Sequence, residues 1–305
     1  MAACKELTTD LVPEFVSSVD TILCDCDGVI WQGKNVVPGA QEALKKLRQK
    51  GKKIFFVTNN STKSRKQYMQ KFTSLGFEVY EEEIVCTAFA AAAYLKYGLK
   101  YEGKVYLMGS AGMEEELELM GYQHTGTGPD PSPSYDLDKW AALPIDPEVK
   151  AVVMGFDEHL SYNKLVKAGT YLNDPNCIFV ATNEDMRYPY QGKVIIPGTG
   201  VLVQAVRAAA GRDPVVLGKP NRYLFESIME THQGINPQRT VMIGDRMSTD
   251  ILMGKNCGLK TLLVETGINS GEEAKEHQRS NSIERQKMVP DYYIKSLGAL
   301  GDGIV

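Results

Sequence analysis

The stretch TILCDCDGVIW, residues 21–31, joins an apolar run to a pair of acidic residues. The pair Ile22–Leu23 predicts a strand, and Asp25 and Asp27 follow where that strand stops. Two carboxylates this close repel each other and are costly to desolvate unless a cation lies between them. The stretch therefore predicts a buried strand whose end holds a positively charged species.

Strands and helices alternate on both sides of this stretch. Residues 38–51 and 63–76 have the apolar spacing of helices, and each ends at a glycine that suits the position after a helix C-terminus. Short apolar runs precede and follow them. These strand-like runs lie within residues 52–62, 83–87, 104–109, 150–156, 176–185, 214–220, 239–258 and 259–267. Fully apolar strands that alternate with helices predict an α/β fold with a parallel sheet covered on both faces.

A loop-rich segment divides the predicted elements into two sets. Residues 121–147 contain five prolines and three glycines and predict a long loop. Just before it, the run Glu114–Glu116 predicts a solvated face. Strand and helix patterns resume after residue 147, so the chain has two α/β sets, which is enough for two domains.

The composition indicates an ordinary globular protein. The chain has 305 residues, of which 43% are apolar and 24% charged, and its formal net charge is -4. A chain of this length predicts about two domains with a sizeable core. It lacks the basic excess that nucleic-acid binding needs, so we expect no nucleic-acid partner.

The N-terminal segment and the cysteines bear on cellular location. Charged residues interrupt residues 1–20 where a signal peptide needs an apolar core, and no run approaches the roughly 18 apolar residues of a membrane span. We therefore expect a cytoplasmic protein with no membrane partner. The six cysteines are scattered without Cys-x-x-Cys pairs, which predicts reduced, mostly buried thiols rather than disulfides or zinc ligands.

Polar residues end four of the predicted strands. In open parallel sheets, ligands bind outside the carboxyl ends of the strands. These ends carry Asp25 with Asp27, the run Thr58-Asn59-Asn60, Lys219, and Asp245 with Asp250. Carboxylates suit a hard cation such as Mg²⁺, while a lysine, a hydroxyl and amides suit a phosphate group. The sequence therefore predicts a phosphate site that contains Mg²⁺.

Each motif alone also has an ordinary structural interpretation. An Asp-x-Asp pair is more often a turn or a helix N-cap than a catalytic pair, and Lys219 alone could be an exposed loop lysine. Ser248 could cap a helix after Asp245. The joint occurrence of the motifs, each at the end of an apolar run, favours the functional interpretation.

Four motifs resemble those of the haloacid dehalogenase superfamily of phosphatases: DCDGVIW, FVTNNST, LGKP and GDRMSTD. The resemblance covers essentially the whole chain. Within the superfamily, the longer stretches around these motifs are similar to the animal enzymes that hydrolyse 2-phosphoglycolate and glycerol 3-phosphate. Pyridoxal phosphate phosphatases are their sister group. The resemblance implies a Rossmann-like parallel-sheet core with an inserted α/β cap domain.

The resemblance also implies a role for each motif residue. Asp25 is the expected nucleophile, which forms an aspartyl-phosphate, and Asp27 is the expected general acid and base. Mg²⁺ is expected at Asp25, the backbone carbonyl of Asp27 and Asp245, with Asp250 in support. The expected phosphate-binding residues are Thr58, Asn59, Asn60 and Lys219. The implied reaction is Mg²⁺-dependent hydrolysis of a small phosphorylated metabolite.

The implied cap domain spans residues 101–211, and the core domain spans 1–100 and 212–305. Arg187 and Tyr188, in a cap loop within residues 181–192, are candidate selecting residues. The alternatives are an exposed loop arginine and a tyrosine that packs against the cap surface. Pyridoxal phosphate phosphatases carry a histidine where this chain has Tyr188, which disfavours pyridoxal phosphate and leaves the substrate open. Homodimers through the cap occur in this family, so a homodimer is expected.

Other functions remain open at this point. A phosphatase of the same family that acts on pyridoxal phosphate or phosphotyrosine is one alternative. A Mg²⁺-dependent binding protein without turnover is another, although such a protein would show a degraded motif. A dinucleotide-dependent oxidoreductase is disfavoured because no glycine-rich run completes Gly-x-Gly-x-x-Gly. Cys24 and Cys26, beside Asp25, are either apolar fillers or oxidation-sensitive thiols.

Overall fold

The computed structural model describes residues 4–132, 135–188 and 193–304. The chain forms two compact units, each with its own parallel sheet. The first unit consists of Met1–Thr58, Met69–Val85 and Lys219–Val305, and the second of Asn59–Tyr68 and Cys86–Gly218.

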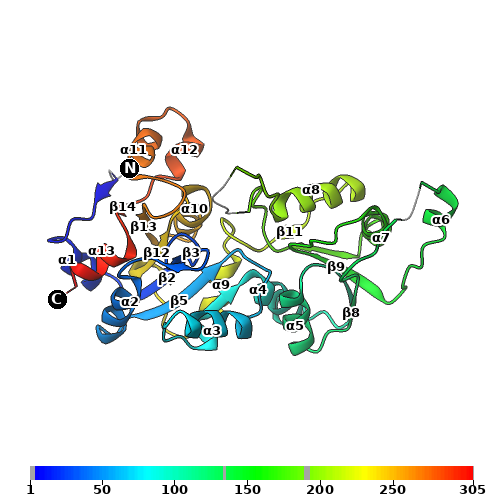
Figure 1. The fold of residues 1–305 in the computed structure, drawn as a ribbon, viewed down its shortest axis with the longest axis horizontal. Coiled ribbons are helices and arrows are strands. Elements are labelled where there is room, and N and C mark those ends of the chain that lie inside the picture. The colour runs from blue at the N-terminus through cyan, green and yellow to red at the C-terminus, as the bar shows by residue number, and fades with distance from the viewer. Residues whose placement is uncertain (1–3, 133–134, 189–192, 305) are drawn as a thin grey trace. The chain divides into compact units, whose positions relative to one another are not determined.

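The first unit is built on a seven-stranded sheet, most of whose strands are labelled in Figure 1. Its strand order is β1 (Lys5–Glu6), β14 (Tyr292–Ile294), β13 (Lys260–Val264), β12 (Thr240–Gly244), β2 (Thr21–Cys24), β5 (Lys53–Thr58) and β6 (Ile84–Cys86). The pairs from β1 to β5 are parallel. Every residue of β2 and β12 is buried, as fully apolar central strands predict.

The helices of the first unit follow the predicted apolar spacing. Helix α2 (Ala40–Gln49) buries Ala40, Ala43, Leu44 and Leu47, packs against α13 (Leu297–Asp302) and is followed by Gly51 with φ 73°. A positive φ is the conformation that glycine adopts most easily after a helix, so this predicted helix end is confirmed. The other helices are α1 (Val12–Ser17), α9 (Tyr223–Thr231), α10 (Leu252–Asn256), α11 (Gly271–Arg279), α12 (Ile283–Lys287) and α3 (Arg65–Ser74), of which residues 69–74 belong to this unit.

Shorter elements complete the first unit. The antiparallel strands β3 (Trp31–Gln32) and β4 (Asn35–Val36) follow the Asp25 motif directly. Single helical turns are η1 (Glu81–Glu83), η3 (Pro237–Arg239) and η4 (Met247–Ile251), the last of which leads into α10. The motif GDRMSTD therefore runs from the last residue of β12 into a helical turn.

The second unit has a five-stranded parallel sheet. Its order is β11 (Val215–Val216), β10 (Ile178–Ala181), β9 (Val149–Met154), β7 (Lys104–Met108) and β8 (His124–Thr125). Helices α7 (Tyr162–Leu172) and α8 (Thr199–Ala210) lie beside this sheet in Figure 1. Their apolar residues, among them Ala168, Leu172, Val203 and Val206, form one buried core with the strands.

The remaining helices of the second unit are α4 (Thr87–Ala93) with the helical turn η2 (Tyr94–Gly98), α5 (Ala111–Leu119) and α6 (Leu137–Ala141). The prediction of a loop over residues 121–147 was partly wrong, because β8 and α6 lie inside it. Helix α6 begins where the Asp136 side chain accepts a hydrogen bond from Lys139 N. Both elements are too short for a periodic pattern to reveal.

The compact units differ from the predicted domain limits. Helix α4 packs against α5, and Ser110 Oγ donates to Ser61 O over 3.1 Å, so residues 59–68 and 86–100 group with the second unit. The functional division into a core domain (1–100 and 212–305) and a cap domain (101–211) stays a prediction, since contacts alone do not define it.

The six cysteines are free thiols, and all except Cys4 are buried, as predicted. Within the described ranges, no helix is both long enough and apolar enough to cross a membrane.

Candidate active site

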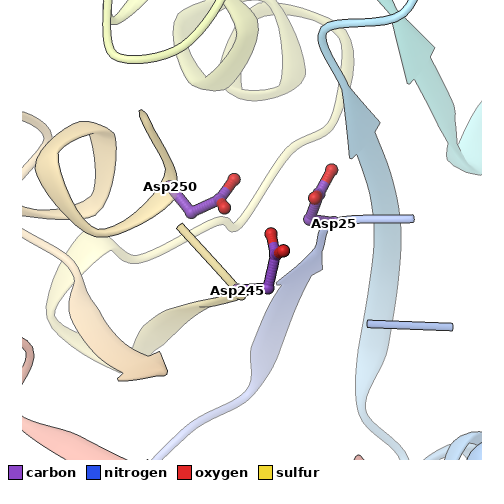
Figure 2. Close-up of side chains that lie close together, drawn as sticks. All are labelled: Asp25, Asp245 and Asp250. Carbon is purple, nitrogen blue, oxygen red and sulfur yellow. The ribbon is translucent and has the colours of Figure 1, made fainter. Parts of the chain in front are cut away.

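Three carboxylates converge beyond the ends of two neighbouring strands of the first unit. Asp25 follows β2 and Asp245 follows β12, while Asp250 comes from the helical turn η4 (Figure 2). The backbone places the first two, because Asp25 N donates to Ile243 O over 2.9 Å and extends the pairing of β2 with β12. One oxygen from each carboxylate lies within 4.8 Å of the others, and all three residues are buried.

Lys219 is the buried cation of this cluster. Its Nζ lies 2.7 Å from Asp25 Oδ1, 2.7 Å from Asp250 Oδ1 and 3.0 Å from the carbonyl oxygen of Val57 on β5. The lysine side chain is 3% exposed. It supplies one positive charge against three carboxylates, so the cluster is negative when all three are ionised.

The pKa values of the cluster reflect this imbalance. Burial, together with Asp250 and Asp245, raises the pKa of Asp25 well above its usual value, although Lys219 opposes the shift. Burial and then Asp250 raise the pKa of Asp245 to about 7. Burial lowers the pKa of Lys219, but Asp25 and Asp250 outweigh it and raise the pKa overall. A second cation would therefore stabilise the ionised carboxylates.

The cluster has the donor set that Mg²⁺ prefers, namely buried carboxylate oxygens. Asp245 Oδ2 is already oriented by Ile268 N, which donates to it over 2.9 Å. Asp250 Oδ2 is oriented by Arg246 N over 3.1 Å. Orientation by backbone donors limits the rearrangement that metal binding requires, so these residues fit the predicted ion.

The turn after β2 brings Asp27 to the same region. Gly28 has φ 85°, and its N donates to Trp31 O over 2.7 Å. A Cβ on Gly28 would also collide with the carboxylate of Asp245. Glycine is required here both for the backbone conformation and for the close approach of Asp245. The side chain of Asp27 accepts a hydrogen bond from Trp31 Nε1 over 2.8 Å.

The predicted phosphate-binding residues do not all belong to one unit. Thr58 is buried at the end of β5, next to the Val57 carbonyl that Lys219 contacts. The division between the units falls after Thr58, so Asn59 and Asn60 group with the second. Asn60 Oδ1 accepts hydrogen bonds from Thr62 N and Oγ1 over 2.9 and 2.7 Å. The structure thus gives Asn60 a local role in its turn.

Asn59 is held by an acidic residue of the second unit. Asp185 Oδ2 accepts hydrogen bonds from Asn59 Nδ2 over 2.8 Å and from Asn183 Nδ2 over 2.7 Å. Gly218, which precedes Lys219, has no room for a side chain because a Cβ would lie 2.7 Å from Asn59 Oδ1. Asp185 thus orients a predicted phosphate-binding side chain.

The two predicted specificity residues belong to the second unit. Arg187 forms an isolated antiparallel bridge with Pro197, and Tyr188 N donates to Ile196 O over 2.9 Å. The Tyr188 ring centroid lies 5.8 Å from that of Phe156, and the residue is 36% exposed. The next residues of the loop, 189–192, lie outside the described residues.

Cys24 and Cys26, which flank Asp25, are fully buried. Burial raises the pKa of both thiols well above the usual value, and Asp25 adds to the shift. Both thiols therefore remain protonated at neutral pH, which favours their role as apolar fillers.

Two family models match the chain. One, described as a haloacid dehalogenase-like hydrolase, matches residues 22–123, and a second, HAD-hydrolase-like, matches residues 216–300. Glycerol-3-phosphate phosphatase from Mus musculus is 45% identical over 98% of this chain and 95% of its own length. The chain belongs to the haloacid dehalogenase-like hydrolase family. The predicted resemblance and the predicted α/β fold are confirmed.

Two further proteins are similar to this hydrolase over most of the chain. Chronophin from Bos taurus is 40% identical over 100% of this chain and 99% of its own length. The solved structure of glycerol phosphate phosphatase from Mycobacterium tuberculosis in complex with magnesium is 26% identical and has a TM-score of 0.75. The match covers 94% of this chain and 77% of the mycobacterial chain.

Sequence reasoning missed two residues that position Asp245 in the first unit and one residue that orients Asn59 in the second. Gly267 leaves room for the Asp245 carboxylate, with which a Cβ would collide, and Ile268 N binds that carboxylate. The sequence feature that could have indicated them is Gly267, the last residue of the strand-like run 259–267. A glycine at this position also fits an ordinary turn. Asp185 stood at the end of another apolar run, but its partner Asn59 lies 126 positions away in the chain.

Proposed function

We propose that this chain is a Mg²⁺-dependent phosphomonoesterase that hydrolyses small phosphorylated metabolites through an aspartyl-phosphate. The observation that carries the proposal is the buried cluster of three carboxylates around one lysine at the strand ends. A negative cluster of this kind repels a phosphate dianion unless a divalent cation joins it.

The proposed Mg²⁺ ligands are the carboxylates of Asp25 and Asp245 and the backbone carbonyl of Asp27. Asp250 would support them indirectly, because it pairs with Lys219 and accepts a hydrogen bond from Arg246 N. When bound, Mg²⁺ would supply positive charge that offsets the repulsion between the Asp25 carboxylate and the phosphate oxygens. The similar mycobacterial phosphatase was solved in complex with magnesium, which supports a role for this ion here.

The reaction would take place in two steps. An oxygen of Asp25 attacks phosphorus and the ester P–O bond breaks, while Asp27 gives its proton to the departing oxygen. Asp27, now ionised, then takes a proton from a water molecule, whose oxygen attacks phosphorus. The bond between phosphorus and the Asp25 oxygen breaks, which releases inorganic phosphate and restores Asp25.

The proposed role of Thr58, Asn59, Asn60 and Lys219 is to bind the phosphoryl oxygens. Donors held in place before the reaction contribute most where charge is redistributed in the transition state. Lys219 is such a donor, since its ammonium group is fixed by three oxygen atoms in a buried position.

The proposed substrates are glycerol 3-phosphate and 2-phosphoglycolate. The printed name of the mouse relative supports a short aliphatic phosphoester, and the presence of Tyr188 in place of a histidine disfavours pyridoxal phosphate. Arg187 and Tyr188 are the proposed selecting residues. A cytoplasmic location and a homodimer formed through the cap complete the proposal.

The test is phosphate release from glycerol 3-phosphate, 2-phosphoglycolate, pyridoxal 5′-phosphate and phosphotyrosine, measured with Mg²⁺ and with EDTA. We expect the two aliphatic esters to have the highest kcat/KM and all turnover to stop in EDTA. Asp25→Asn, purified in the same way, is the control for contaminating phosphatases. Release that persists in EDTA would refute the metal assignment, and a preference for pyridoxal 5′-phosphate would refute the substrate assignment.

A further inference from the structure

Trp31 makes an unusual contact with the proposed acid and base. Its ring is fully buried, and its indole Nε1 donates a hydrogen bond to Asp27 Oδ1 over 2.8 Å. A buried indole N–H requires an acceptor, and a backbone carbonyl would serve. Here the acceptor is instead a side-chain carboxylate that is only partly buried.

The indole ring has little freedom to move. The Phe72 ring packs against it edge-on at a centroid distance of 4.8 Å, and Lys71 Nζ lies 3.7 Å from the ring centroid. The backbone of Trp31 is also fixed, because its N donates to Cys26 O over 3.2 Å and its O accepts from Gly28 N over 2.7 Å. The indole N–H is therefore a donor of fixed position and direction.

We propose that Trp31 is a positioning residue for Asp27. The indole N–H occupies Oδ1 and leaves Oδ2 as the oxygen that exchanges a proton. In the first step the Oδ2–H bond breaks as the departing ester oxygen takes the proton, and in the second step Oδ2 takes a proton from water. The inference rests on the proposed function and adds to it the residue that orients the acid.

A positioning role for Trp31 predicts different effects on substrates whose leaving groups differ in basicity. Glycerol 3-phosphate releases an alkoxide, which is strongly basic and must be protonated as it leaves. p-Nitrophenyl phosphate releases a stable phenolate, which leaves without help. A side chain that acts only by positioning Asp27 should therefore matter for the first substrate and much less for the second.

The experiment compares kcat/KM for the two substrates in the parent and in Trp31→Phe, which keeps a ring and removes the N–H. The parameter kcat/KM covers only the steps up to departure of the alcohol or phenol. We expect a loss of roughly 10- to 100-fold for glycerol 3-phosphate, within the range of general acid catalysis, and a loss of at most about threefold for p-nitrophenyl phosphate.

Phe72→Leu is the matched control, because it loosens the packing of the same ring and leaves the indole N–H in place. Its ratio of the two kcat/KM values should equal that of the parent. If Trp31→Phe does not fold, the indole N–H is removed without a change of shape by incorporating benzothienylalanine into a Trp140→Phe background. The chain has two tryptophans, so once Trp140 has been changed to phenylalanine the analogue is incorporated at Trp31.

The outcomes are distinguishable. An equal loss for both substrates, or a ratio that also changes in Phe72→Leu, would overturn the positioning role while the parent remains an active phosphatase. A parent that hydrolyses neither substrate would overturn the proposed function, and the inference with it. Asp27→Asn is the reference for complete loss of the acid.

Discussion

Each unit of this hydrolase buries a lysine among carboxylates, but the two clusters differ in charge balance. In the second unit, Lys164 Nζ lies 2.7 Å from Asp157 Oδ2, and the two side chains are 0% and 1% exposed. That ion pair contains one cation and one anion. In the first unit, the buried Lys219 pairs with Asp25 and Asp250, and Asp245 adds a third carboxylate to the same cluster.

This difference in balance separates a structural cluster from a functional one. The pair of Asp157 and Lys164 is complete, since Asp157 Oδ1 also accepts a hydrogen bond from His159 N over 2.8 Å. Breaking such a pair leaves an uncompensated buried charge. The first cluster already contains uncompensated charge, so removal of one carboxylate relieves repulsion there. We therefore expect opposite effects on stability and on activity in the two units.

The strongest test of the comparison is Asp25→Asn. We expect turnover of glycerol 3-phosphate to fall at least about 10⁴-fold, because the nucleophile is lost. The melting temperature without metal should stay equal to that of the parent or rise, because one repelling charge is removed. Phosphate release and circular dichroism melting measure the two effects. Turnover near the parent level would place the nucleophile elsewhere.

The second test is Asp157→Asn, which should lower the free energy of unfolding by about 3–5 kcal/mol, since it leaves the buried Lys164 charge unpaired. Turnover per folded molecule and the Mg²⁺ requirement should not change. Urea unfolding followed by fluorescence gives the stability. The double variant Asp157→Leu/Lys164→Met is the control, and it should recover most of the loss. A single variant as stable as the parent would show that the pair is not structurally important.

The third test is Mg²⁺ binding as a function of pH. Because the pKa of Asp245 is raised to about 7, this carboxyl is protonated below that pH, and Mg²⁺ must displace the proton. The apparent affinity for Mg²⁺ should therefore fall as the pH decreases from 8 to 6, by at least about tenfold per pH unit below the pKa, since the proton on Asp25 competes as well. Isothermal titration calorimetry without substrate measures it.

Two variants control the third test. Asp245→Asn should bind Mg²⁺ weakly and with a shallower pH dependence, because only the proton on Asp25 still competes with the metal, while Asp157→Asn should behave as the parent. Affinity that is independent of pH in the parent would show that Asp245 is not a ligand whose proton competes with the metal.

The smallest expected effect concerns the second unit and substrate choice. Tyr188→His should change the ratio of kcat/KM for glycerol 3-phosphate to that for pyridoxal 5′-phosphate by an amount equivalent to about 1–3 kcal/mol, because one contact in the selecting loop is altered. The Mg²⁺ requirement should remain, since the proposed metal ligands lie in the first unit. An unchanged ratio would exclude Tyr188 from substrate selection.

Local patterns in the sequence predicted the sheets and most of the acidic cluster. Fully apolar runs indicated the strands, and a polar residue after such a run must lie at the carboxyl edge of a parallel sheet, as Asp25, Thr58 and Asp245 do. The strands β1, β8 and β14, of two or three residues each, were missed, because elements this short have no periodicity and form only by pairing with a neighbouring strand.

Contacts between distant positions depended on the tertiary structure. The run Glu114–Glu116 was predicted to be solvated, which was wrong for Glu116, since it is fully buried and accepts a hydrogen bond from Arg65 N over 2.6 Å. The two ion pairs of Lys219 and the contact of Asp185 with Asn59 likewise join residues more than 30 positions apart. Residue type and spacing specify which chemical groups follow a strand, whereas the packing of the whole chain decides which of those groups meet and how their charges balance.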